Sequence, residues 1–283
     1  MQIDKKLIAE SFSRAAKTYD AFAFLQKEVA SRTFERLSYM NVKPKKILDA
    51  GCGTGLCSRQ LRDDFSRAKI CAVDLAPGMI ELAKTDQKTF KKIDYQVADI
   101  DSLPYEDNTF DIVFSSLTIQ WVPNLGKTFS ELNRVLKPGG LIIFSTLGPD
   151  TLYELKESWQ SVDAKTHVNE FIDMHIVGDA VFNSNFENVV MDRDVITLTY
   201  QTMKGLMKDL KSIGAHNIND DRPKGMMGKT QYKKLENAYE RFRKDGVLPA
   251  TYEVIYGHAW KKSEPAPKDY HTYSVEIQEA TKS

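Results

Sequence analysis

The middle of the chain alternates short apolar runs with amphipathic segments, and this alternation predicts the fold class. Residues rich in Ile, Val, Leu and Phe predict buried strands at 46–50, 69–74, 93–97, 110–115 and 140–147. Apolar residues spaced at helical intervals predict helices between them, at 55–64, 77–86 and 125–136. Strands and helices that alternate in this way are typical of a parallel sheet with helices on both faces. We therefore expect an α/β fold.

The segments on either side of this core follow a less regular pattern. Residues 5–40 carry apolar side chains at helical spacing and predict a helical arm that Pro44 ends. Beyond residue 147 the pattern predicts a helix at 150–159, a helix pair with a loop at 166–183, a strand at 189–200 and an amphipathic helix at 203–213. It then predicts a loop rich in Gly, Pro, Asn and Asp at 215–229, a helix at 230–244 and a strand at 249–260.

We expect one domain over 1–262, followed by a loose polar tail at 263–283. Within the domain, 1–43 forms an N-terminal helical arm, 44–147 a ligand-binding core, and 148–262 a set of substrate-side helices and last strands. The extra helices decorate one edge of the sheet, where they and the arm would help to cover the ligand site.

Composition and charge narrow the class of protein. The 39 basic residues balance the 39 acidic ones, which does not favour a general nucleic-acid binder. The three cysteines show no zinc spacing and are expected to be free thiols in a reducing cytosol. No apolar run reaches 18 residues and the N-terminus has no apolar signal region, so a cytoplasmic protein without membrane, metal or nucleic-acid partners is predicted.

A glycine-rich turn follows the first predicted strand, where residues 49–55 read DAGCGTG. Glycines at alternate positions allow the backbone to approach a ligand closely and to adopt positive φ angles. Asp74 ends the second strand, where an acidic residue can accept hydrogen bonds from both ribose hydroxyls of a nucleoside. Ligands in this architecture bind at the carboxyl ends of the strands, so the pattern predicts a nucleoside cofactor.

The spacing of the glycines distinguishes between cofactors. A dinucleotide fingerprint places its third glycine three residues after the second, but here Gly55 follows Gly53 by two. This short loop resembles the first motif of the class I S-adenosylmethionine-dependent methyltransferases. Three later segments in the same order also resemble motifs of that family, VADI at 97–100, FDIVFSS at 110–116 and LKPGG at 136–140. The resemblance implies a Rossmann-like methyltransferase fold with a mostly parallel seven-stranded sheet, and S-adenosyl-L-methionine as the cofactor.

The same resemblance implies which residues bind the cofactor. They lie at the ends of the first four strands: Asp49, Gly51, Gly53, Gly55, Asp74, Leu75, Met79, Asp99, Ile100 and Ser115. The glycines would approach the methionine moiety, while Asp74 would hold the ribose and Asp99 the adenine amine. A plain tight turn would also account for the glycines, a helix N-cap for Asp74, and ordinary core packing for Met79.

Segments outside the core resemble a narrower family, the malonyl-[acyl-carrier protein] O-methyltransferases of biotin synthesis. They read SFSRAAKTYD at 11–20, TLGPDTLYEL at 146–155, DMHIVGD at 173–179, LMKDLKSIGA at 206–215 and LPATYEV at 248–254. The resemblance implies that the free carboxylate of a malonyl thioester takes the methyl group, with malonyl-acyl carrier protein or malonyl-CoA as the acceptor. A carboxylate is ionised at pH 7, so this reaction needs no general base.

Three residues are candidates for the reaction itself. Tyr19 lies on the N-terminal arm, which is our candidate lid, and the family resemblance suggests that it contacts the substrate. Gln120 and Trp121 follow the fourth strand, where the tryptophan would form an apolar wall or a cation–π partner for the sulfonium. Packing of Tyr19 and Trp121 in the core is the alternative. An arginine or lysine of the decorating helices is expected to hold the malonyl carboxylate.

Residues 201–244 contain an excess of basic side chains over acidic ones. Acyl carrier proteins are strongly acidic, so this edge is a candidate docking face, although a solvated helix surface would look the same. The residues that we assign to this face are Lys204, Lys208, Lys211, Arg222, Lys233, Lys234 and Arg241.

Two other functions remain open from sequence. A small-molecule methyltransferase of the quinone-synthesis type would share the core motifs, although it would not need the pattern at 202–260. The segments at 150–155 and 248–252 also resemble a mitochondrial complex I assembly factor linked to arginine hydroxylation, and the absence of an N-terminal transit segment argues against that function.

Overall fold

A single seven-stranded sheet organises the molecule, with strand order β3-β2-β1-β4-β5-β7-β6. The computed structural model describes residues 4–86, 92–163, 165–214 and 228–263. The strands are β1 (Lys46–Ala50), β2 (Lys69–Asp74), β3 (Asp94–Val97), β4 (Phe110–Ser116), β5 (Leu136–Leu147), β6 (Phe186–Tyr200) and β7 (Leu248–Lys261). The first five pair in parallel, and β7 is antiparallel to both of its neighbours. The predicted mostly parallel α/β fold is thus confirmed.

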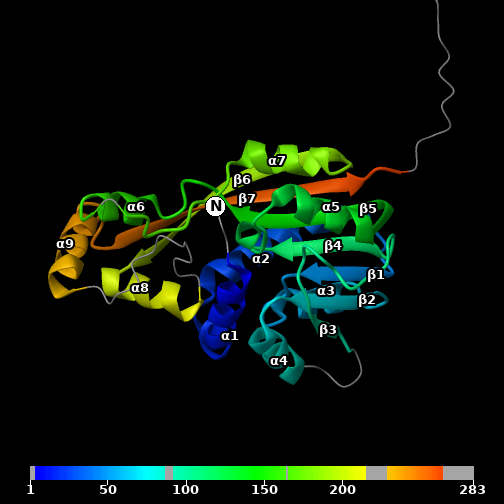
Figure 1. Ribbon diagram of the computed structural model, residues 1–283, viewed down its shortest axis with the longest axis horizontal. Coiled ribbons are helices and arrows are strands. Elements are labelled where there is room, and N and C mark those ends of the chain that lie inside the picture. Colours follow the sequence, from blue (N-terminus) through cyan, green and yellow to red (C-terminus); the bar gives the residue numbers. More distant parts are fainter. Residues whose placement is uncertain (1–3, 87–91, 164, 215–227, 264–283) are drawn as a thin grey trace, which may run out of the picture.

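Helices cover both faces of the sheet (Figure 1). The helices α2 (Phe24–Ser38), α3 (Leu56–Asp64) and α4 (Pro77–Thr85) pack on one face, where Phe34 and Phe114 stack with ring centroids 4.8 Å apart. The helices α5 (Leu125–Val135) and α7 (Met174–Asn183) pack on the other face. This sandwich fixes the carboxyl ends of β1, β2 and β4 beside one another.

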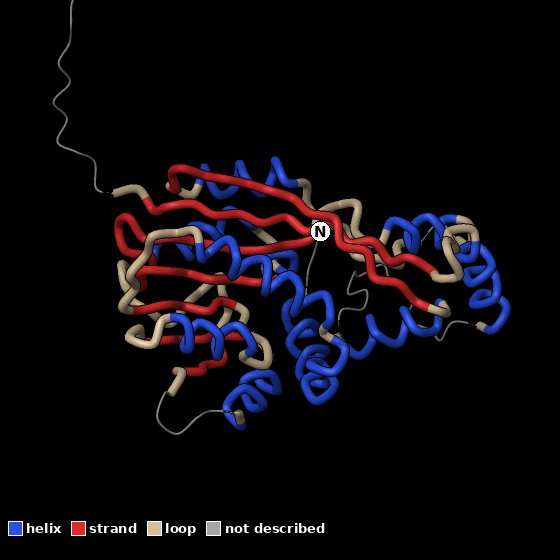
Figure 2. The backbone as a smooth tube through the Cα atoms, turned by 180° about the vertical axis from the view of Figure 1, so that it is seen from behind, coloured by secondary structure: helices blue, strands red, loops and turns tan. Residues whose placement is uncertain are grey.

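The two last strands project beyond the rest of the sheet. β7 pairs with β5 only from Val254 onward, whereas its pairing with β6 extends to Leu248. The projecting part carries α6 (Tyr153–Gln160), α8 (Met203–Ser212) and α9 (Lys229–Glu240), which share an apolar cluster with it. Figure 2 shows this lobe beside the main sheet, at the right of the view.

The N-terminal arm consists of two helices. The sequence predicts helix over residues 5–40, but α1 (Lys5–Phe22) ends at Ala23, whose backbone has φ −81° and ψ 46°. Ala23 is buried, and the chain turns there before α2 begins. The helical character was predicted and the break was not, because an alanine carries no local signal for a turn.

A second difference concerns residues 166–183. A helix pair was predicted, but within the part of this segment that the structure describes only α7 is helical. The predicted tail lies outside the described residues except for its first position, as does nearly all of the predicted loop at 215–229. None of the helices in the described ranges has the length and apolar character needed to cross a bilayer.

Candidate functional site

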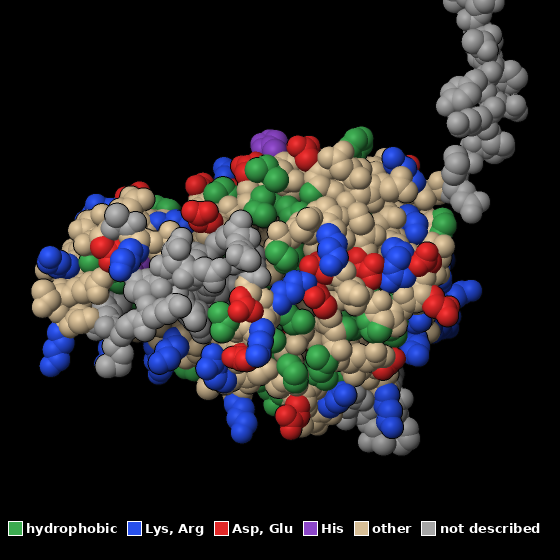
Figure 3. Space-filling view, viewed as in Figure 1, with side chains coloured by type: hydrophobic (Ala, Val, Ile, Leu, Met, Phe, Trp, Pro, Cys, Tyr) green, Lys and Arg blue, Asp and Glu red, His purple; other side chains and the backbone are tan. Residues whose placement is uncertain are grey.

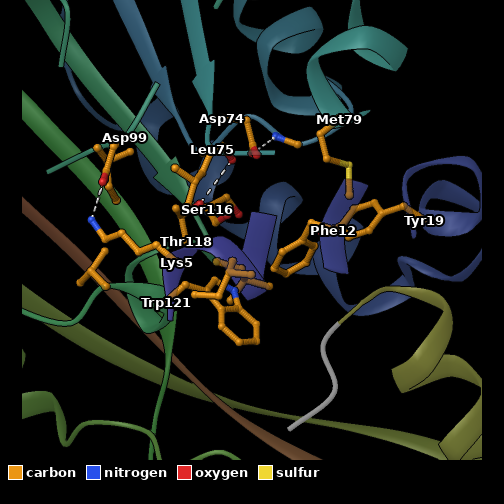
Figure 4. Close-up of a pocket in the computed structure, with 16 residues that line it drawn as sticks. Lys5, Phe12, Tyr19, Asp74, Leu75, Met79, Asp99, Ser116, Thr118 and Trp121 are labelled. Carbon is orange, nitrogen blue, oxygen red and sulfur yellow. Dashed lines mark hydrogen bonds and ion pairs between the residues drawn. The ribbon is translucent and has the colours of Figure 1, made fainter. Parts of the chain in front are cut away.

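The carboxyl ends of β1, β2 and β4 open into a cavity whose other wall is α1 (Figure 4). The cavity has a volume of about 680 Å³, including the part that is open to solvent. The side chains or backbone of these residues line it: Lys5, Ile8, Phe12, Tyr19, Gly51, Gly53, Asp74, Leu75, Met79, Asp99, Ile100, Ser116, Leu117, Thr118, Trp121 and Val122.

The glycine turn is built so that only glycine fits at its first position. Gly51 has φ +84°, and a Cβ atom there would lie 2.0 Å from the hydroxyl oxygen of Thr118. Gly53 also has positive φ, and both glycines line the cavity. A bound ligand can therefore approach the backbone between β1 and α3 without meeting a side chain.

Gly55 has a different place in the turn. It is the residue before α3 with φ +83°, and a Cβ atom there would lie 2.4 Å from the hydroxyl oxygen of Tyr95. Gly55 is buried and is not part of the cavity wall. Its requirement for glycine thus comes from packing against β3, and any effect on a ligand is through the shape of the turn.

Asp74 lies in the cavity wall and is held by two backbone N–H groups. The amide nitrogens of Gly53 and Ala76 each donate to its carboxylate at 2.8 Å. Burial raises the pKa of Asp74 above its ordinary value, although these two hydrogen bonds oppose the shift. Each carboxylate oxygen can accept a second hydrogen bond, so the group can also receive a pair of ribose hydroxyls.

Asp49 acts from behind the turn. It is 1% exposed and accepts a hydrogen bond from the hydroxyl of Ser58 at 2.5 Å. Burial raises the pKa of Asp49 to about 7, while the hydrogen bond from Ser58 opposes this and the nearby charge of Asp74 adds to it. Asp49 does not line the cavity, so a role in orienting the turn fits better than direct contact with a ligand.

The structure contradicts the assignment of Ser115 to the cofactor site. Its side chain is fully buried, and its hydroxyl donates to the carbonyl oxygen of Ala50 at 2.7 Å. Ser116 lines the cavity instead. Successive residues of a strand point to opposite faces, so an error of one position moves the side chain out of the site.

Asp99 and Ile100 line the cavity as expected, but Asp99 has a partner that the sequence did not indicate. The ammonium of Lys5 lies 2.7 Å and 2.6 Å from the two carboxylate oxygens of Asp99 and 2.5 Å from Asp101. Burial alone would lower the pKa of Lys5, but the hydrogen bonds that it donates to Asp101 and Asp99 outweigh burial and raise the pKa. Lys5 comes before all of the sequence motifs described above. Its partner Asp99 is 94 residues away, and nothing in the sequence around Lys5 indicates this pairing.

The two apolar candidates serve both the cavity and the core. Leu75 lines the cavity and is partly exposed. Met79 also lines it, but it is 1% exposed and packs against Ala16 and Tyr19 of α1 (Figure 4). Core packing of Met79 is thus confirmed, and its contact with the cofactor stays a prediction that its place in the cavity wall allows.

A second cavity of about 560 Å³ adjoins the first. Phe12, Tyr19, Leu117 and Trp121 line both cavities. The second one is also lined by residues of α2, α8, β5, β7 and the loops after β4, before α6 and before α7: Leu25, Gln26, Gln120, Leu147, Thr151, Leu152, Asn169, Phe171, Leu210, Ile213 and Tyr252. Two connected sites with one shared wall suit a reaction between two bound molecules.

The reaction candidates divide between these cavities. Tyr19 and Trp121 are in the shared wall, where the ring of Phe12 meets both at centroid distances of 6.5 Å and 5.3 Å. Gln120 lines only the second cavity, where its amide donates to the carbonyl oxygen of Leu117 at 2.8 Å. The sequence placed Gln120 and Trp121 together after the fourth strand and Tyr19 on the arm, whereas the structure places Gln120 in the second cavity and the other two in the wall that both cavities share.

The hydroxyl of Tyr19 remains protonated in this setting. Burial raises the pKa of Tyr19 well above its usual range, and the negative charges of Asp74 and Asp20 add to the shift. Within the described part of the chain, no protein group hydrogen-bonds to this hydroxyl, so it can donate to a ligand. A proton donor, not a base, is what the site provides at this position.

No lysine or arginine is among the residues that line the second cavity within the described ranges. The expected cationic clamp for the substrate carboxylate is thus missing from that set. Neutral groups are present, and the side-chain oxygen of Gln26 is buried there without a hydrogen-bond partner in the described structure.

The basic residues of the candidate docking face lie on two separate helices. Lys204, Lys208 and Lys211 are exposed on α8, where their spacing places them along one side of the helix. On the α9 side, Lys233 pairs with Glu236 at 3.0 Å and Arg241 with Glu157 at 2.9 Å. Lys234 is exposed on α9, and Arg222 lies outside the described residues. Figure 3 shows basic side chains along this edge of the molecule.

Comparison with known proteins gives consistent results. A family model described as a methyltransferase domain matches residues 48–144. A malonyl-[acyl-carrier protein] O-methyltransferase of Gallionella capsiferriformans is 47% identical, over 94% of this chain and 93% of that protein. An enzyme of the same name from Laribacter hongkongensis is 44% identical, over 91% of this chain and 90% of that one.

Among solved structures, a phosphoethanolamine N-methyltransferase of Haemonchus contortus in complex with S-adenosyl-L-methionine has a TM-score of 0.55. It is 18% identical and covers 89% of this chain and 57% of its own. At this identity the likeness concerns the fold alone.

Proposed function

Because this chain belongs to the malonyl-[acyl-carrier protein] O-methyltransferase family, we propose that it methylates the free carboxylate of a malonyl group carried by an acyl carrier protein. The protein is an S-adenosylmethionine-dependent methyltransferase. The product is a methyl ester, which hides the negative charge of the acyl chain from later enzymes and so serves as a primer in biotin synthesis. The observation that supports this function best is the pair of cavities with a common wall of Phe12, Tyr19, Leu117 and Trp121.

The first cavity fits the cofactor. S-adenosylmethionine, when bound, would supply a methyl group bonded to a positively charged sulfur. A carboxylate oxygen can take this methyl group, and the sulfur leaves as the neutral thioether of S-adenosylhomocysteine. Asp74 would accept the ribose hydroxyls, and the backbone at Gly51 and Gly53 would approach the methionine portion. Asp99 and Ile100 would hold the adenine. The role of Asp74 follows from the backbone N–H groups that already hold its carboxylate in place. The role of the turn follows from its glycines, which have no side chain to keep a ligand away.

The second cavity would hold the malonyl group, and the protonated hydroxyl of Tyr19, which lines this cavity, would donate to its carboxylate. The unpartnered atom of Gln26 is an amide oxygen, which accepts hydrogen bonds and would serve another part of the acyl group. A carboxylate that is held by neutral groups keeps more of its nucleophilic charge than one paired with a lysine or arginine. The wall residues Phe12 and Trp121 would exclude water from the reacting atoms.

Catalysis on this scheme depends on placement. A carboxylate is ionised at pH 7 and needs no base, which agrees with a tyrosine whose pKa is raised. Holding the acceptor and the methyl donor in line can supply roughly 7–11 kcal/mol of the barrier. The residues of the common wall touch both cavities, so they determine this alignment.

We assign carrier-protein docking to α8 in preference to α9. Lys204, Lys208 and Lys211 are exposed on α8, and the same helix contributes Leu210 and Ile213 at its end to the second cavity. On α9, Lys233 is already paired with an acidic neighbour, and Arg241 just beyond it is paired as well. An acidic partner on α8 would thus lie at the entrance that the acyl chain must use.

We further propose that the protein works in the cytoplasm, where its three cysteines, which are all free, would stay reduced.

The deciding experiment is a methyl-transfer assay. Tritium-methyl S-adenosylmethionine is mixed with the protein and malonyl-acyl carrier protein, and acetyl-acyl carrier protein, which lacks a free carboxylate, is the control. We expect label on the malonyl species alone, and loss of the label on mild base, which hydrolyses a methyl ester. No label on either carrier, with cofactor binding intact, would contradict the proposal and favour a small-molecule acceptor.

A further inference from the structure

The ion pair of Lys5 with Asp99 and Asp101 lies at the first cavity, and the reaction above gives Lys5 no role. Lys5 begins α1, and its side chain reaches along the cavity to the end of β3 (Figure 4). The side chain of Asp101 is 2% exposed and also accepts a hydrogen bond from the hydroxyl of Thr128. An ammonium beside a buried carboxylate is held more firmly than a pair on the open surface.

α1 forms a removable wall of this cavity. Lys5, Ile8, Phe12 and Tyr19 lie on one side of the helix and all line the cavity. At Ala23 the chain leaves helical geometry, so α1 is joined to α2 through a non-helical residue and is not continuous with it. The cavity between this wall and the strand ends is partly open to solvent, and movement of α1 would widen the opening through which a ligand passes.

Three contacts fasten the wall to the core, and they differ in strength. Near the middle, the amide of Gly78 donates to the hydroxyl of Ser13 at 3.1 Å. Near the end, the hydroxyl of Thr54 donates to Asp20 at 2.7 Å. Both involve an uncharged partner, whereas Lys5 joins an ammonium to two carboxylates. The hydrogen bond to the carboxylate of Asp20 is also charge-assisted, but only at Lys5 are both partners charged, so Lys5 makes the strongest of the three contacts.

We propose that Lys5 is the latch of the cofactor site: its ion pair with Asp99 and Asp101 holds α1 closed over the adenosine end of the cavity and limits the exchange of cofactor for product. Opening requires the ammonium to leave both carboxylates, and closing restores the contact after a ligand has entered. The inference rests on the cofactor site and not on the acceptor, so it can fail or hold independently of the malonyl assignment.

A latch has a kinetic signature that an ordinary ligand contact lacks. A residue that only contacts the ligand changes the dissociation rate constant and leaves association nearly unchanged. A residue that holds the site closed slows both steps, because the ligand enters and leaves by the same opening. Removing it therefore raises both rate constants, while the dissociation constant changes less than either of them.

The test is to measure both rate constants for S-adenosylhomocysteine by surface plasmon resonance on the whole protein. In Lys5→Met we expect association and dissociation each to rise about tenfold, which corresponds to about 1.4 kcal/mol at the barrier. Lys5→Arg, which keeps the charge, should stay near the wild type. Lys6→Met is the matched control, since Lys6 is the next residue of α1 and is exposed.

The result that overturns the proposal is an association rate constant that does not change in Lys5→Met, whether or not dissociation becomes faster. If Lys5→Met does not fold, the wild-type protein still provides a test. Both rate constants should rise together as sodium chloride increases from about 0.05 to 0.5 M, because salt screens a partly exposed ion pair. Rate constants that do not respond to salt in the wild type would likewise exclude a latch.

Discussion

At the scale of single residues, the site divides into positions that line the cavity and positions that shape the backbone behind it. Asp74 belongs to the first kind, since it lines the cavity with a carboxylate fixed by two N–H groups. Asp49 and Gly55 belong to the second, because both are buried behind the turn. The sequence motif contains both kinds of residue, and only the burial of each residue in the structure distinguishes them.

Removal of the Tyr19 hydroxyl tests its proposed role as a donor. Tyr19→Phe keeps the ring packed against Phe12 and Met79 but removes the hydrogen bond to the substrate carboxylate. A hydrogen bond to a charged group contributes roughly 1.5–3 kcal/mol, so kcat with malonyl-acyl carrier protein should fall about 10- to 100-fold with little change in Tm. The control is Tyr39→Phe, since Tyr39 is 76% exposed on the surface. Unchanged turnover in Tyr19→Phe would remove this residue from the mechanism.

The buried carboxyl of Asp49 predicts a particular dependence of stability on pH. An aspartate ionises near 3.9 in an unfolded chain, whereas burial raises the pKa of Asp49 to about 7 in the folded protein. Between these values the folded state holds a proton that the unfolded state has lost, so the free energy of unfolding falls as pH rises. This cost is complete above pH 7.

Asp49→Asn removes that titration while an amide oxygen can still accept from Ser58. The free energy of unfolding of the wild type, relative to this variant, should fall between pH 5 and pH 8 by on the order of 1–3 kcal/mol. Urea denaturation at both pH values measures the difference. Parallel curves for the two proteins would show that Asp49 is not responsible for a pH effect.

At the scale of helices and strands, the sequence predicted most elements and missed what joins them. The five parallel strands and the helices between them follow from apolar periodicity. The break at Ala23 and the irregular stretch before α7 do not, because tertiary packing determines both. The site shows the same division: the turn, Asp74 and Asp99 were predicted, whereas Lys5 became visible only when α1 was placed against β3.

Reversal of charge on one helix at a time tests the docking assignment. The double variant Lys204→Glu with Lys208→Glu on α8 should raise KM for malonyl-acyl carrier protein about tenfold, while KM for malonyl-CoA changes little. Lys233→Glu with Lys234→Glu on α9 should have the smaller effect.

The control for charge alone is Lys43→Glu with Lys45→Glu. Both lysines are exposed before β1, at the end of the sheet away from the cavity. If the two acceptors respond alike to reversal on α8, or if α9 has the larger effect, our docking assignment is wrong.

At the scale of the whole molecule, family membership and fold agree with the resemblance found in the sequence. Relatives named malonyl-[acyl-carrier protein] O-methyltransferase match about nine tenths of the chain, including the segments outside the core. These outer segments are what separates this family from the quinone-type methyltransferases and the assembly factor considered at first. The division of the chain into arm, core and substrate-side parts stays a prediction.

Ligand binding should stabilise the whole fold, because the proposed cofactor site lies between α1 and the sheet. At 100 times its dissociation constant, S-adenosylhomocysteine should add about 2.7 kcal/mol to the free energy of unfolding, a shift of roughly 5 °C in Tm. Asp74→Ala, which removes the carboxylate from the cavity wall, should lose most of this shift. A variant that keeps the full shift would contradict the assignment of Asp74 to the cofactor.

The common wall of the two cavities has a consequence for inhibitor design. Phe12, Tyr19, Leu117 and Trp121 separate the sites by the thickness of single side chains. A compound that joins an adenosine to a short dicarboxylic acid would fill both sites at once, and the second half would bind at the high effective concentration that a short linker provides. Such a compound would discriminate among methyltransferases through its acid half, since the adenosine half meets motifs that the whole superfamily shares.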